Sequence, residues 1–131
     1  MRLLPTFSKR SEDAMIAVIF EVMPANGRKN DYLAHATRLR SELERMDGFI
    51  SVERFQSLTD PDKLLSLSFW RDEAAVAAWR CHGQHRATQA AGRGGIFRDY
   101  RLRVAAVARD YGLKERDEAP ADSRAAHDPL I

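Results

Sequence analysis

The sequence has one cysteine, no long apolar run and almost no net charge, and each shortage excludes a class of protein. Cys81, being alone, cannot form an internal disulfide or a zinc-binding cysteine cluster within one chain. No stretch approaches the roughly 18 to 20 apolar residues that cross a bilayer, and the first residues lack the apolar segment of a signal peptide. The 21 Lys and Arg residues are dispersed and nearly balanced by 19 Asp and Glu residues, so we expect no nucleic acid and no membrane as partner. Together these shortages predict a cytoplasmic protein.

Four segments have the composition of β-strands. Residues 14–23 are a nearly continuous apolar run rich in β-branched side chains, which predicts a central strand. Residues 49–58 and 63–71 are expected to form a hairpin, because a proline and two aspartates between them favour a tight turn. Residues 97–109 alternate apolar and polar side chains and predict a long last strand.

Two segments have the periodicity of amphipathic helices. The first is expected to start at Asn30, as its N-cap, and to end at Gly48. Its apolar positions recur three and four residues apart, at Leu33, Ala36, Leu39, Leu43 and Met46. The second is expected to start at Asp72, also an N-cap, and to run through Trp79 to a break at Gly83.

This order of elements predicts an α+β fold: a ferredoxin-like βαββαβ arrangement with a four-stranded antiparallel sheet and both helices on one face. The 131 residues suffice for one such domain. We expect it to occupy residues 13–111. Residues 1–12 are predicted to be a flexible N-terminal arm, and residues 112–131 a polar C-terminal tail that buries little surface.

The first predicted strand is apolar on both faces. Ile16, Val18, Phe20 and Val22 alternate with Ala17, Ile19 and Met23. Because the helices cover only one face of such a sheet, the second apolar set needs another cover. A homodimer through the open sheet faces would supply it. The alternative is that the tail folds over its own sheet, which its polarity disfavours.

Three features occur together and in order along the chain: Gly48-Phe49, the Trp-Arg-Asp sequence at 70–72, and Trp79 followed by His85-Arg86. Through them, a segment of about residues 14–111 resembles the antibiotic biosynthesis monooxygenase (ABM) family. The resemblance implies a dimeric α/β-barrel with a pocket between helices and sheet in each subunit. Members of the family range from cofactor-free oxidation of phenols and quinols to haem degradation, so the fold leaves the function open.

The haem-degrading branch of the family uses an asparagine on the first strand, a tryptophan on the second helix and an iron-binding histidine further along. Trp79 matches the tryptophan. Residues 18–21, where the asparagine is expected, contain none, and Gln89 stands where the histidine would be. Haem is therefore disfavoured, and no cofactor is expected.

Four residues are candidates for substrate binding. Trp79, Trp70 and Phe69 could form the walls of a pocket for a flat molecule, although the tryptophans could equally fill the core. Arg54 could steady an anionic substrate. Since Arg54 and Glu53 are neighbours on a predicted strand, they are expected to point to opposite faces, and a solvated strand edge is the alternative reading for both.

His82 and His85 are the candidates for catalysis. A histidine titrates near neutral pH and could remove the proton of a phenol, which leaves an electron-rich anion. The alternative is that they cap the helix or lie on the surface beside Gly83. Their spacing does not suit a zinc pair, so no metal site is predicted.

These observations lead to one main hypothesis and two alternatives. The main hypothesis is a cofactor-independent monooxygenase-like enzyme that oxidises a small phenol- or quinol-like aromatic in a pocket between helices and sheet. The first alternative is a dimer that binds or senses a small molecule without catalysis. The second is a haem-binding protein.

Overall fold

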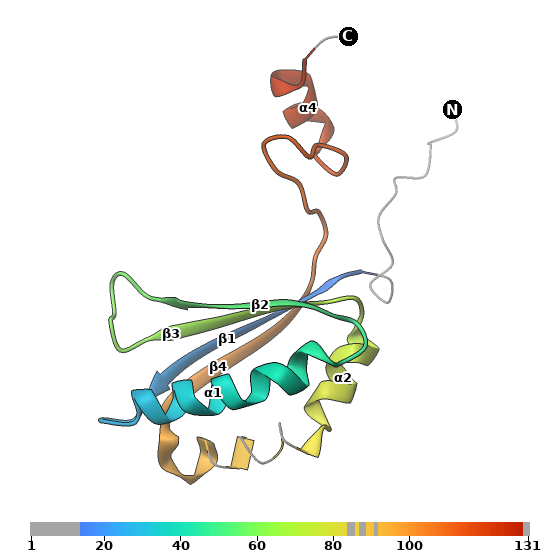
Figure 1. The fold of residues 1–131 in the computed structure, drawn as a ribbon. Helices are drawn as coiled ribbons and strands as arrows, with labels where there is room; N and C mark the ends of the chain where they lie inside the picture. Colours follow the sequence, from blue (N-terminus) through green and yellow to red (C-terminus); the bar gives the residue numbers. More distant parts are fainter. Residues whose placement is uncertain (1–13, 84–85, 87–88, 91, 130–131) are drawn as a thin grey trace.

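The computed structural model describes residues 14–83, 86, 89–90 and 92–129. Its elements follow one another in the order strand, helix, strand, strand, helix, strand, with a short helix near the C-terminus (Figure 1). They are β1 (Ile16–Pro24), α1 (Lys29–Glu44), β2 (Phe49–Gln56), β3 (Leu64–Trp70), α2 (Glu73–Arg80), the π-helical turn η1 (Gly92–Ile96), β4 (Phe97–Ala106) and α4 (Ala121–His127).

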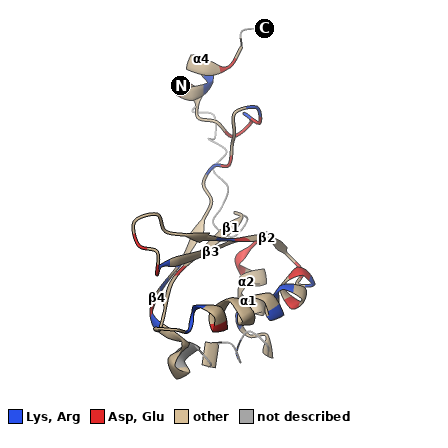
Figure 2. Cartoon of the chain, turned by 60° about the vertical axis from the view of Figure 1, so that its left-hand side comes forward, with Lys and Arg blue, Asp and Glu red and all other residues tan. Residues whose placement is uncertain are grey.

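The four strands form one antiparallel sheet in the order β2-β3-β1-β4. Both α1 and α2 lie against the same face of this sheet, so the molecule has two layers (Figures 1 and 2). The predicted ferredoxin-like arrangement is confirmed. Of the helices in the described part of the chain, none has the length and apolarity that a bilayer crossing requires.

The core lies between the helices and the sheet, in two adjoining clusters. The first contains Ile16, Leu43, Trp70, Ala75, Val76 and Trp79, and the second Val22, Tyr32, Leu64 and Ile96. The even-numbered residues of β1 face this core, as the alternation of a strand requires. Gly48, in the loop after α1, adopts a positive φ of 85° and turns the chain into β2.

Helix α1 begins earlier than the sequence suggested. Its cap is Arg28 and Asn30 lies inside the first turn, so the prediction of Asn30 as N-cap is wrong. The amide of Tyr32 donates to the carbonyl oxygen of Arg28 at 3.0 Å, and the Tyr32 side chain is buried in the second core cluster. Packing of this aromatic ring therefore recruits the residues before Asn30 into the helix. The predicted N-cap of α2 is confirmed, because the Asp72 carboxylate accepts the amide of Ala75 at 2.9 Å.

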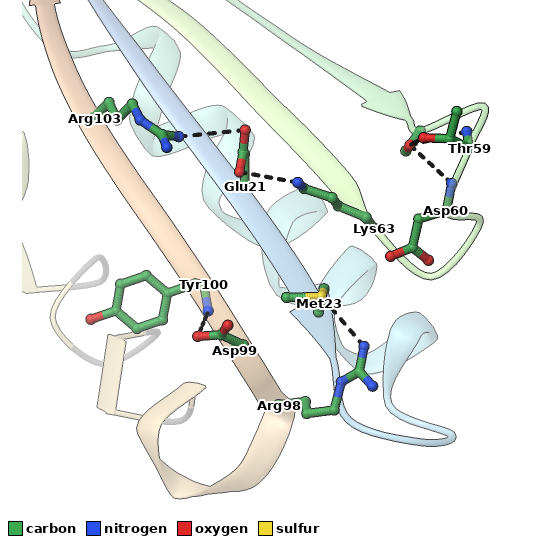
Figure 3. Close-up of polar contacts among 10 residues, drawn as sticks. Glu21, Met23, Thr59, Asp60, Lys63, Arg98, Asp99, Tyr100 and Arg103 are labelled. Atoms are coloured by element: carbon green, nitrogen blue, oxygen red, sulfur yellow. Dashed lines mark hydrogen bonds and ion pairs between the residues drawn. The ribbon is translucent and has the colours of Figure 1, made fainter.

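The open face of the sheet is apolar at one end and charged at the other. Ala17, Ile19, Leu65, Leu67 and Phe69 lie on this side of β1 and β3. Further along β1, the Glu21 carboxylate lies 3.2 Å from Lys63 Nζ and 3.4 Å from Arg103 Nη1 (Figure 3). The two apolar faces expected for β1 are thus present, with a cluster of ion pairs at one end of the open face.

Residues 107–129 leave the sheet on the side opposite to α1 and α2 (Figures 1 and 2). Arg116 organises this segment. Its guanidinium donates to the Asp128 carboxylate at 2.8 Å, to Ser123 Oγ at 2.6 Å and to the carbonyl oxygen of Gly112 at 3.1 Å. The polar C-terminal segment therefore contains a local structure built around one arginine.

Candidate functional site

The strongest candidate for chemistry lies where α2 ends. The imidazole of His82 stacks on the indole of Trp79, with ring centroids 5.4 Å apart and an interplanar angle of 23°. Helix α2 ends at Arg80, but the amide of His82 still donates to the carbonyl oxygen of Trp79 at 3.0 Å, which continues the helical turn. The geometry confirms that Trp79 and His82 lie on one side, as their spacing of three residues predicted.

A carboxylate from the other helix faces this histidine. Glu42 Oε2 on α1 lies 3.8 Å from Nε2 of His82. The side chain of His82 is 30% exposed, so a small molecule can reach the ring. An imidazole beside a carboxylate can accept a proton from a substrate hydroxyl, because the carboxylate stabilises the imidazolium that results.

An apolar surface lies along β4. Tyr100, Leu102 and Val104 are each more than 40% exposed, and their partners on β1 are Val22, Phe20 and Val18, so they share the face that carries the helices. The ring of Tyr100 is 5.7 Å from that of Phe20. We call Tyr100, Leu102 and Val104 the β4 apolar surface.

This surface connects to the Trp79 cluster through β1. Val18 packs against the core cluster that contains Trp79, and it is paired with Val104 of β4. An aromatic molecule on the β4 apolar surface would therefore lie on the same side of the sheet as Trp79 and His82. Such a surface can bind a flat apolar molecule through its rings and aliphatic side chains.

The structure distributes the other predicted site residues differently. Trp70 is 1% exposed and its indole Nε1 donates to Ser68 Oγ at 2.9 Å, which places it in the core, with its ring centroid 6.3 Å from that of Trp79. Phe69 lies on the open face. His85 lies outside the described residues, so its catalytic role stays a prediction.

Arg54 points to the helix side of β2, and Glu53 points to the open side, as their adjacency predicted. Both line a hollow of about 420 Å³ along β2. Neither Trp79 nor His82 lines this hollow. The sequence-based site therefore divides into a Trp79–His82 site and an Arg54 hollow.

Two residues of the site were missed by sequence reasoning. Glu42 lies on α1, and only the approach of α1 to the end of α2 brings its carboxylate to His82. Tyr100 belongs to the predicted last strand, but its aromatic contacts depend on the pairing of β4 with β1. Among the described residues, no three His, Cys, Asp or Glu side chains form a group that could hold a metal ion.

Comparisons with known proteins agree with this architecture. Residues 15–91 match the family model described as antibiotic biosynthesis monooxygenase. A jasmonate monooxygenase ABM of Pyricularia oryzae is 47% identical over 93 residues, which are 71% of this chain and 43% of that protein. The chain thus spans less than half the length of this relative. The uncharacterized protein YqjZ of Bacillus subtilis is 32% identical over 111 residues, 82% of this chain and 92% of YqjZ.

Solved structures show the same fold at low sequence identity. Rv0793 from Mycobacterium tuberculosis superposes with a TM-score of 0.68 at 18% identity, over 76% of this chain and all of that one (100%). SnoaB from Streptomyces nogalater, a cofactor-independent oxygenase solved in a mutant form, superposes with a TM-score of 0.65 at 9% identity, over 74% of this chain and 96% of SnoaB. At such identities the likeness concerns the fold.

Proposed function

This chain belongs to the antibiotic biosynthesis monooxygenase family, and from that premise we propose that it is a cofactor-independent monooxygenase acting on a small phenol- or quinol-like aromatic. The observation that carries the proposal is the His82 imidazole stacked on Trp79 and facing the Glu42 carboxylate at 3.8 Å. The β4 apolar surface provides the platform for the ring of the substrate. His82 is the proposed base, and His85 remains a second candidate.

The proposed reaction converts a phenol and O₂ to a quinone and water. His82 takes the phenolic proton, and the resulting phenolate is electron-rich enough to transfer electrons to O₂. One oxygen atom forms a C–O bond at a ring carbon that loses its hydrogen, and the other oxygen atom leaves as water with the two hydrogens removed from the substrate. The substrate supplies all the electrons, so the balance requires no other reductant.

A second candidate substrate comes from the relative in Pyricularia oryzae, which is named a jasmonate monooxygenase. The identity of 47% over 93 residues supports testing jasmonate beside the phenols. Because this chain corresponds to 43% of that protein, the whole activity of the relative is a proposal for this chain.

The proposal includes a homodimer formed through the open sheet faces. The apolar end of the open face, with Ile19, Leu67 and Phe69, supports it, because exposed apolar patches of this kind are commonly interfaces. Sedimentation equilibrium of the full chain tests this part separately from catalysis, and a monomer at micromolar concentration would contradict it.

The test of catalysis is O₂ consumption with a panel of phenols, quinols and jasmonate, with ¹⁸O₂ used to follow oxygen into the product. His82→Ala should lower the rate by about 10² to 10⁴-fold, the usual contribution of a general base. His35→Ala is the matched control, because His35 is on α1, contacts Arg38 and has no part in the proposed reaction. It should leave the rate unchanged.

Glu42→Gln should lower the rate less than His82→Ala, because it removes the charge that stabilises the imidazolium but keeps the base. No ¹⁸O in any product would reject the monooxygenase. A melting shift with the same compounds and no turnover would then support the alternative of a non-catalytic binding protein.

A further inference from the structure

A hollow of about 420 Å³ lies along β2, away from the Trp79–His82 site. Strand β2 is at the edge of the sheet, and α1 packs beside it (Figure 1). The lining residues are Arg40, Ser51, Val52, Glu53, Arg54, Leu67 and Phe69. They come from α1, β2 and β3, so the hollow is built by three elements that the fold holds in fixed register.

The lining divides between the two faces of the sheet. Val52 and Arg54 are paired with Ser68 and Ser66 of β3, whose partners on β1 face the helices, so this part lies on the helix side together with Arg40 of α1. The other lining residues, which are Ser51, Glu53, Leu67 and Phe69, belong to the open face. The helix-side part therefore stays accessible when the open faces of two subunits pack together.

Arg54 is the unusual member of the helix-side part. Its Nε atom is buried and has no hydrogen-bond partner. Glu53 cannot supply one, because neighbours on a strand point to opposite faces. Within the described residues, Arg54 has no ion-pair partner within 4.0 Å. A buried guanidinium N–H without an acceptor is costly, so an acceptor from outside the chain would stabilise it.

Arg40 adds a second guanidinium to the hollow. Leu39 and Leu43 of α1 belong to or pack against the core cluster that Val52 of β2 also contacts, and this packing holds Arg40 beside β2. Arg40 pairs with Glu44 at 3.0 Å, and the two side chains are 60% and 55% exposed. An exposed pair of this kind contributes little to stability, so a ligand can draw the Arg40 side chain toward itself at small cost.

The charges and the apolar lining define the ligand. The charge of Arg40 is balanced by Glu44, so one unbalanced positive charge remains, on Arg54, and a ligand with a single negative charge neutralises it. Guanidinium groups bind carboxylates through paired N–H donors, which favours a carboxylate over other anions. Val52, between the two faces of charge, offers an apolar contact to the body of the ligand.

We propose that the helix-side part of the hollow, formed by Arg40, Val52 and Arg54, binds a small organic monocarboxylate, with the carboxylate on Arg54 and the apolar body against Val52. This site is separate from the proposed oxidation site and does not depend on it. Binding satisfies the buried Nε of Arg54, which the chain itself leaves without an acceptor.

The test is calorimetric titration of the full chain with benzoate, and with benzamide as the uncharged analogue of the same shape. Benzoate should bind and benzamide should bind at least about tenfold more weakly, since the charge-assisted hydrogen bonds are lost. Arg54→Gln should weaken benzoate by a similar factor, and Arg40→Gln by less. Arg38→Gln, which changes an exposed arginine of the same helix that contacts His35, is the control and should bind like the wild type.

Equal binding of benzoate and benzamide, or benzoate binding that Arg54→Gln leaves unchanged, would overturn the proposal. No binding of benzoate would also overturn it, and dissociation of an oligomer by Arg54→Gln would then show that a second copy supplies the acceptor. The benzoate and benzamide comparison uses the wild-type chain, so it decides the question even where a variant fails to fold. Oxidation in the Arg54→Gln variant should be unchanged, which separates this test from that of the proposed function.

Discussion

A β-carbon placed on Gly48 would lie 2.6 Å from the β-carbon of Ala75. This contact joins the loop after α1 to the first turn of α2, and the carbonyl oxygen of Gly48 also accepts the amide of Arg71, just before α2, at 2.7 Å. The close approach explains why glycine stands here: its φ of 85° and the missing side chain are both required.

Gly48→Ala should therefore lower the free energy of unfolding by about 2 to 4 kcal/mol, the sum of a positive-φ cost and overpacking against α2. Gly27→Ala is the matched control, because Gly27 also has a positive φ, of 75°, but no atom within 4 Å of an added β-carbon. It should cost only the backbone part, roughly 1 to 2 kcal/mol. Urea denaturation of both variants measures the difference, and equal losses would show that the contact with Ala75 has no energetic role.

Arg71 should make the stability of this corner depend on acid pH. Its guanidinium binds both oxygens of the Asp47 carboxylate, at 3.1 and 3.0 Å, and Asp72 at 2.8 Å. The hydrogen bonds from Arg71 hold the pKa of Asp47 and the pKa of Asp72 below their ordinary value of 3.8. A carboxylate with a lowered pKa stabilises the fold above its ordinary pKa and loses that contribution as the pH falls through the lowered value.

Arg71→Gln should consequently reduce the acid sensitivity of the melting temperature below pH 3.8, while the wild type loses stability steadily there. Arg45→Gln is the control, because Arg45 is 77% exposed and lies 3.8 Å from its carboxylate partner. Added salt should narrow the difference between wild type and Arg71→Gln, since exposed pairs are screened. Identical acid profiles for the wild type and Arg71→Gln would refute the assignment.

Local chemistry was predictable from the sequence, and contacts between elements were not. Asp72 could be identified as an N-cap, and Arg54 and Glu53 as residues on opposite faces, because capping and alternation depend on a few neighbouring residues. The pair of His82 with Glu42 depends on how α1 and α2 approach each other. The start of α1 was misplaced for the same reason, since the burial of its first aromatic ring against the sheet outweighed the capping preference of Asn30.

The buried hydrogen bond from Trp70 to Ser68 should contribute to stability. Ser68→Ala would leave the indole N–H of Trp70 without its acceptor in the core, at a cost of about 1 to 3 kcal/mol. Ser66→Ala is the matched control, because Ser66 lies two residues earlier on the same strand and face, opposite Phe20. Urea denaturation of Ser68→Ala in the wild type and in Trp70→Phe should show that the cost shrinks when the donor is removed. An unchanged cost in the Trp70→Phe background would place the effect elsewhere.

Arg116 should hold the C-terminal segment together without contributing to the stability of the sheet. Helix α4 has seven residues, too few to persist alone, and Arg116 links it through Ser123 and Asp128 to the carbonyl oxygen of Gly112. Arg116→Ala should therefore abolish amide protection in α4 while changing the global free energy of unfolding by less than about 0.5 kcal/mol. Arg124→Ala, which removes only a 3.6 Å contact with Asp128, should retain most of the protection. Hydrogen exchange measures both, and a protected α4 in Arg116→Ala would show that other contacts hold the segment.

The same segment should loosen in acid. The pKa of Asp128 lies below its ordinary value of 3.8, chiefly because of its hydrogen bond with Arg116. The carboxylate therefore stabilises the segment above the ordinary pKa, and this contribution is lost as the pH falls through the lowered value. Amide protection of α4 in the wild type should decline over that range, whereas Asp128→Asn, which lacks the titrating group, should show weak protection that acid does not change further. Protection of the wild-type α4 that persists after Asp128 is protonated would mean that the neutral carboxyl group still holds Arg116.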